Sequence, residues 1–266
     1  MWNWKRNDAQ LAVAPDQNRC FTVFRDPAFL ASRFWPVNRR AVSRLRSMLL
    51  APEFAPITHA FGVLEPPLNE VAAELHAWKA EIRDVAELTR VTVDLCAGLR
   101  MLEPLGAPWF NRLWIGTTST QWRTAYFDGF INGGDPFPPV SYLARRMQCL
   151  GVVVVAALDS IQIQEYGPDQ TDWLNLRWAV VATNDDPWYW QHFGEVRSFE
   201  ESANYAKRRI KDRFTLSMLR RYCLALGIPL ETEEFGPDAV IERPVVPPGE
   251  HRFETLAQAR TRLQLA

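Results

Sequence analysis

The sequence predicts an α+β fold, with an antiparallel or mixed central sheet, helices packed on it, and a helical N-terminal third. Apolar side chains recur every three or four residues in the first hundred positions, and apolar and polar side chains alternate from residue 112 onward. Short turns, not helices, join the alternating stretches, which favours antiparallel pairing. We expect one domain over residues 1–266, with a mainly helical subregion (1–105), a sheet-plus-helix core (106–228) and an acidic, proline-interrupted tail (229–266).

Two helices are expected in the first third. Residues 32–50 place apolar side chains on one stripe and most of their arginines elsewhere. A second amphipathic stripe follows Pro66 and Pro67 and covers residues 68–85. Residues 91–95 alternate, so a strand and a continued helix both remain open there.

The strand patterns begin at residue 112. Residues 112–118 and 121–127 are rich in strand formers and are separated by a short turn. Alternation in the second pattern places Trp122 and Tyr126 on one face. Further strand patterns cover residues 152–155, expected to be covered on both faces, and 173–183.

A long helix is predicted after the last of these strands. Ser198 and Glu201 form a capping-box pattern, and the apolar stripe continues to about Leu226 before Gly227. Thr215 is a second capping residue, which leaves a break near that position open. A short helix is also expected from about residue 253.

Composition excludes several classes of protein. The net charge of −1 removes the electrostatic case for general nucleic-acid binding. The four cysteines contain no CxxC pair and have no neighbouring histidine, so we expect reduced thiols and no metal site or cofactor. No secretory signal and no apolar run long enough to cross a membrane is visible, which predicts a cytoplasmic protein without membrane contact.

Acidic and aromatic side chains in predicted loops are the candidate functional residues. The four aspartates are Asp128, Asp135, Asp185 and Asp186, and turn formation alone accounts for aspartate in such positions. Trp188, Tyr189 and Trp190 follow a turn-rich stretch, and three consecutive rings of an extended chain cannot all point inward. At least one ring is therefore a candidate partner anchor or stacking platform, with capping of the sheet edge as the alternative.

Six segments share a pattern of aromatic, acidic and arginine residues: TTSTQWRTAYFD (117–128), GGDP (133–136), VSYLARR (140–146), FE (199–200), YAKRRIKDRF (205–214) and LALGI (224–228). Together they resemble a group of bacterial immunity-type proteins encoded beside Rhs and other polymorphic toxins, many of which are delivered by type VI secretion. The resemblance covers roughly residues 107–228 and implies a non-enzymatic protein that occludes the active site of a cognate toxin C-terminal domain. No catalytic residues carry over.

The residues expected to contact the toxin are the aromatic and acidic ones: Trp122, Tyr126, Asp128, Asp135, Asp185, Asp186, Trp188, Tyr189 and Trp190. The aspartates are expected to face a basic cleft of the toxin. Two other functions stay open. One is a hydrolase or transferase that uses His192 with Asp185 or Asp186. The other is a module that binds a ligand on the rings of residues 188–190.

Overall fold

A computed structural model describes most of the chain beyond residue 48. The described residues are 49–82, 86–107, 110–168, 175–246, 249 and 251–265. All of them belong to the unit Arg39–Ala266, the second of the two units into which the chain divides. The helix expected over residues 32–50 therefore lies almost wholly outside the described residues.

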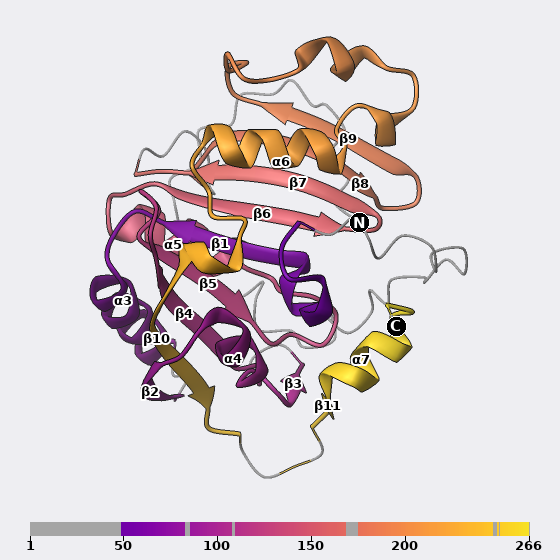
Figure 1. Cartoon of the computed structure of the whole chain (residues 1–266). Coiled ribbons are helices and arrows are strands. Elements are labelled where there is room, and N and C mark those ends of the chain that lie inside the picture. Colours follow the sequence, from indigo (N-terminus) through magenta and orange to yellow (C-terminus); the bar gives the residue numbers. More distant parts are fainter. Residues whose placement is uncertain are drawn as a thin grey trace, which may run out of the picture. The chain divides into compact units, whose positions relative to one another are not determined.

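Nine strands form one sheet within the described part of the chain. Their bounds are β1 Ala60–Leu64, β2 Ala86–Thr92, β4 Leu113–Thr118, β5 Thr124–Asp128, β6 Gly151–Ala157, β7 Ser160–Tyr166, β8 Leu176–Asn184, β9 Trp188–Phe193 and β10 Phe235–Pro244. Their order is β2-β10-β4-β5-β1-β6-β7-β8-β9, and every neighbouring pair is antiparallel (Figure 1). The strands β6 to β9 follow one another as a meander and end at one edge of the sheet.

Helices cover both faces of this sheet. Apolar side chains of α3 (Leu68–Glu81) and α5 (Phe137–Arg146) pack on one face, and those of α4 (Leu95–Arg100) and α6 (Leu216–Ala225) pack on the other. The smaller elements are η2 Pro52–Phe54, η3 Ile57–His59, η4 Ser202–Ala206, η5 Ile210–Asp212, η6 Thr232–Glu234, β3 Leu105–Gly106, β11 Phe253–Glu254 and α7 Leu256–Arg262. None of the described helices combines the length and the apolar character that crossing a bilayer requires.

Strand β6 shows how alternation builds two cores. Val152 and Val154 belong to the cluster under α4 and α6, whereas Val153 and Val155 belong to the cluster under α3 and α5. Each side chain leaves water on its own face, and full burial of a valine stabilises the fold by about 1.5–3 kcal/mol. The predicted strand covered on both faces is confirmed.

The predicted fold class is wrong. The described part is mostly a large antiparallel sheet with few helices, and residues 49–107 contain β1, β2 and β3 beside α3 and α4. Strand β1 is buried along its whole length, so its sequence does not alternate. Strand β2 is largely exposed and has no apolar face, so periodicity does not show it either.

Residues 229–246, expected to begin a tail, instead contain a strand in the interior of the sheet. Strand β10 pairs with β2 on one side and with β4 on the other. The register with β4 shifts between Phe235 and Ala239, and Pro237 lies in that irregular stretch. A proline lacks the N–H that a regular ladder needs, so the shift accommodates it. Ala239 and Ile241 point into the core.

The long helix predicted from Ser198 is also wrong. The chain forms η4 and η5 before α6 begins, and the hydroxyl of Thr215 caps α6 by accepting the N–H of Met218 at 3.4 Å. The break at Thr215 is thus real. The expected capping box does not form, because the N–H of Glu201 donates to the hydroxyl of Tyr222 at 2.6 Å and the carboxylate of Glu201 pairs with Arg221.

Candidate functional site

The β8–β9 hairpin brings five of the nine predicted partner-binding residues together. Asp185 and Asp186 are exposed in its turn. Trp188, Tyr189 and Trp190 form the first half of β9, so they lie in a strand and not in the predicted loop. Strand β9 is the last strand of the sheet and pairs with β8 alone among the described strands.

The three rings divide between the two faces of the sheet. Trp188 and Trp190 are half-buried against the core under α6. Tyr189 points to the opposite face and is 45% exposed. One of three consecutive rings therefore stays in solvent, as the alternation argument expects. The rings do not form one flat platform, because two of them serve the core.

Trp122 and Tyr126 lie far from this hairpin and are buried. The indole N–H of Trp122 donates to the carbonyl of Leu226 at 2.7 Å, and its ring joins the core under α4 and α6. Tyr126 joins the opposite core, so the prediction that the two rings share a face is wrong. Strand β5 is five positions from β9 in the sheet, about 24 Å away.

Asp128 is buried and holds a turn together. Its buried carboxylate accepts the N–H of Phe130 at 3.0 Å and that of Asp135 at 2.8 Å. Burial, followed by the neighbouring charge of Asp135, raises the pKa of Asp128 to about 7. Asp135 itself is an exposed loop residue that precedes α5 by two positions. The turn-forming interpretation of Asp128 therefore accounts for this residue.

His192 pairs with Glu200, which belongs to the resembling FE segment but is not among the predicted site residues. The Nε2 atom of His192 lies 3.1 Å from Oε2 of Glu200. Asp185 and Asp186 lie in the turn before β9, whereas His192 is the fifth residue of that strand, about 13 Å along it from Trp188. The structure pairs the Nε2 atom of His192 with Glu200 and not with the predicted Asp185 or Asp186.

The Glu200 side chain is fully buried and accepts four hydrogen bonds. Oε1 accepts the backbone N–H of Arg197 at 2.6 Å and the indole N–H of Trp178 at 2.9 Å. Oε2 accepts from Tyr205 at 2.6 Å and is the atom that faces His192. Burial and the hydrogen bond to Glu200 raise the pKa of Tyr205 well above its usual range.

This Glu200 network anchors the chain that follows β9. A carboxylate has about four acceptor positions, and all four are used here. The network ties residues 197–206 to β8 and β9, and it continues from Tyr205 to the hydroxyl of Tyr222 on α6 at 3.0 Å. These hydrogen bonds thereby hold strand β9, at the edge of the sheet, in place. The capping-box pattern around Ser198 concealed this role of Glu200.

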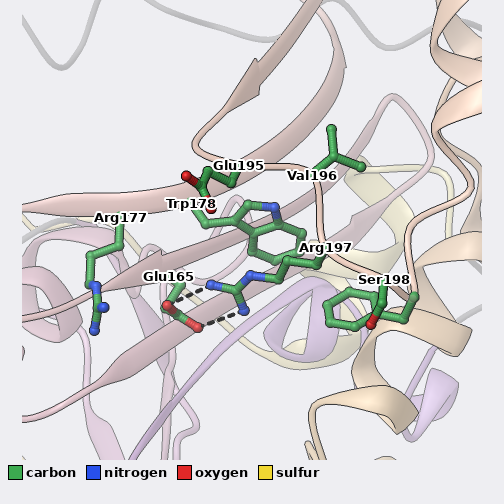
Figure 2. A pocket seen from close by; sticks show the side chains of 8 residues that line it. Glu165, Arg177, Trp178, Glu195, Val196, Arg197 and Ser198 are labelled. Carbon is green, nitrogen blue, oxygen red and sulfur yellow. Dashed lines mark hydrogen bonds and ion pairs between the residues drawn. The ribbon is translucent and has the colours of Figure 1, made fainter.

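A pocket of about 560 Å³ opens beside the end of β9. Figure 2 shows the guanidinium of Arg197 facing the carboxylate of Glu165, with N–O distances of 2.7 and 2.9 Å. The same guanidinium lies 4.4 Å from the centre of the Trp178 ring. Arg197 is therefore held on two sides, whereas Arg177 at the rim is exposed. Charged side chains therefore line the pocket.

The two edges of the sheet differ in charge. Strand β2 carries Glu87 and Arg90, both exposed, and charged side chains on an edge strand discourage pairing with another chain. Strand β9, with the sequence WYWQHF, contains no aspartate, glutamate, lysine or arginine. We call residues Trp188–Phe193 the β9 edge. This edge lacks the protection that β2 has.

No family model, curated protein or solved structure matches the chain. In the described ranges, no group of three or more histidine, cysteine, aspartate and glutamate side chains is placed to hold a metal ion.

Proposed function

We propose that this chain is an immunity-type protein that binds a bacterial toxin domain and occludes its active site, with the β9 edge as its contact surface. The observation that carries the proposal is the uncharged, aromatic edge strand, which is held in place by the Glu200 network. The resemblance of residues 107–228 to immunity-type proteins supports the nature of the partner. The protein would act in the cytoplasm, where it meets the toxin domain.

An edge strand of this composition suits a protein partner. Its backbone can extend the sheet into a second chain through main-chain hydrogen bonds, and alternate side chains then set specificity. Tyr189 offers a large exposed ring, and tyrosine is among the residues that most often dominate binding energy. A strand that is already rigid loses little conformational entropy on binding.

Co-expression with a toxin domain tests the proposal. The genes beside this one are sequenced, and the variable C-terminal domain of an adjacent Rhs-type toxin is produced in cells with and without this chain. We expect growth to be rescued and the two proteins to purify together. Rescue without co-purification, or co-purification without rescue, would contradict occlusion of the toxin.

A pair of matched substitutions on the two sheet edges tests the contact surface. Tyr189→Lys places a charge on the β9 edge, and Leu88→Lys places the same charge at an exposed position of β2. Loss of a dominant contact costs about 2 kcal/mol, so Tyr189→Lys should weaken toxin binding roughly 30-fold. Leu88→Lys should leave the affinity unchanged. Isothermal titration calorimetry measures the affinity of both variants for the toxin domain. Equal losses of affinity would contradict the β9 edge as the contact surface.

A further inference from the structure

A run of basic residues lies beside the β9 edge. Residues 207–213, which we call the basic segment, contain five basic residues and one acidic residue. The acidic residue, Asp212, pairs with Arg209 at 2.6 Å. Lys207, Arg208 and Lys211 are exposed, and within the described ranges no ion pair involves their side chains.

One hydrogen bond closes the basic segment on itself, and two contacts place it against β9. The Nε–H of Arg213 donates to the carbonyl of Lys207 at 2.7 Å. The guanidinium carbon of Arg213 lies 5.9 Å from the centre of the Trp190 ring. Element η5 lies against both β8 and β9. Among the described strands only β8 pairs with β9, and Figure 1 shows the basic segment in orange beside β9.

The positively charged side chains of the basic segment together produce a positive electrostatic potential. The pKa of Asp212 is held below its ordinary value, first by the hydrogen bond from Arg209 and further by the charges of Lys211 and Lys207. Like charges held this close repel one another, and a clustered field of one sign attracts an oppositely charged partner. Asp212 is paired with Arg209, and among the described residues no ion pair joins a carboxylate to Lys207, Arg208 or Lys211.

We propose that the β9 edge and the basic segment form one surface that receives an extended, acidic segment of a protein partner by strand addition. This inference rests on the proposed function and specifies the chemistry of the partner. Main-chain hydrogen bonds to β9 supply the docking, and carboxylates on the added strand pair with Lys207, Arg208 and Lys211. The partner surface is therefore acidic here, the opposite of the basic cleft expected from the aspartates.

A single-stranded nucleic acid fits this surface less well. Such ligands stack their bases on open aromatic faces. Trp190 and Tyr205 lie against each other instead, with ring centres 4.9 Å apart, and both are half-buried. The free backbone of an edge strand is a feature that a peptide uses and a nucleic acid does not.

A defined peptide tests the inference with the full chain. The probe is a fluorescein-labelled peptide of alternating valine and glutamate, followed by fluorescence anisotropy, with a valine–lysine peptide and a labelled oligothymidylate as comparisons. We expect the acidic peptide to bind more tightly than both, and added salt to weaken it as the Debye length falls from about 10 Å at 0.1 M to about 3 Å at 1 M. Preference for the lysine peptide or for the oligonucleotide would overturn the inference.

Two charge reversals locate the binding site. Arg208→Glu changes the basic segment, and Arg123→Glu makes the same change at an exposed position of the β4–β5 turn. Arg208→Glu should weaken the acidic peptide roughly tenfold, and Arg123→Glu should not. Equal losses would mean that the peptide responds to total charge, which would overturn the site.

Hydrogen exchange tests the strand addition itself. Amide exchange in residues 188–193 should slow when the acidic peptide is bound, because the outward N–H groups of β9 become hydrogen-bonded. Unchanged exchange with a bound peptide would overturn strand addition. Toxin rescue without peptide binding would remove this inference alone, and peptide binding without rescue would remove the proposed function alone.

Discussion

At the scale of single residues, Asp128 makes folding stability depend on pH. Its carboxylate closes the loop that leads from β5 to α5, and its pKa of about 7 is well above the ordinary value of 3.8. The folded chain therefore binds this proton more tightly than the unfolded chain does. Because the folded chain holds more protons in this range, the free energy of unfolding falls as pH rises from about 4 to about 7.

Replacing Asp128 tests this sign. Asp128→Asn removes the titration but keeps one acceptor for the loop N–H groups, so the variant should be less stable at pH 4 and should not lose further stability toward pH 7 through this group. Asp135→Asn removes the neighbouring charge and should lower the pKa of Asp128, which reduces the slope of the wild-type curve. Urea denaturation at several pH values measures all three proteins. An Asn variant with the wild-type slope would show that another group titrates.

At the scale of elements, Glu200 anchors the chain that follows β9. Glu200→Gln replaces an oxygen that accepts hydrogen bonds by an amide that donates, and it leaves buried donors without an acceptor. We expect a loss of about 1–3 kcal/mol in the free energy of unfolding. Glu201→Gln is the matched control, because Glu201 pairs with Arg221 on the surface, where such pairs contribute about 0–1 kcal/mol. Denaturant midpoints decide, and equal losses would contradict the anchor role.

The same elements show what local sequence can predict. Two features can be predicted from local sequence: Thr215 as a helix cap, and residues 152–155 as a strand covered on both faces. Both depend on residues that are close in the sequence, a hydroxyl before a helix and a run of valines. The location of β9 is not recoverable in this way. Its rings follow a turn, and only pairing with β8 makes them a strand. The anchoring role of Glu200 likewise depends on its hydrogen bonds with Trp178 and Tyr205. No local sequence pattern connects these two residues with Glu200.

At the scale of the whole described unit, long-range pairing decides both the fold and the site. The nine predicted site residues separate into a buried group on β4–β5, an exposed loop position at Asp135 and a group at the β8–β9 hairpin. Sequence order suggests proximity for Trp122 and Tyr126, but the two faces of the sheet keep them apart. The basic segment reaches the hairpin only because η5 lies against β8 and β9.

Strand β10 gives the prediction that belongs to this scale. It is the sole described link between β2 and the rest of the sheet, and it also covers the free side of β4. A chain that ends at residue 230 exposes both neighbours and leaves the core without Ala239 and Ile241.

We expect that shortened chain to show no cooperative thermal unfolding transition by circular dichroism. A chain that ends at residue 246 is the control, because it keeps β10 and loses only β11 and α7. The control should retain a cooperative transition at a lower temperature, since it loses the buried Ala259 and the hydrogen bonds of Arg260 to the carbonyls of Pro52 and Glu53. A cooperative transition in the chain that lacks β10 would contradict this prediction, because it would show that the rest of the sheet folds without β10.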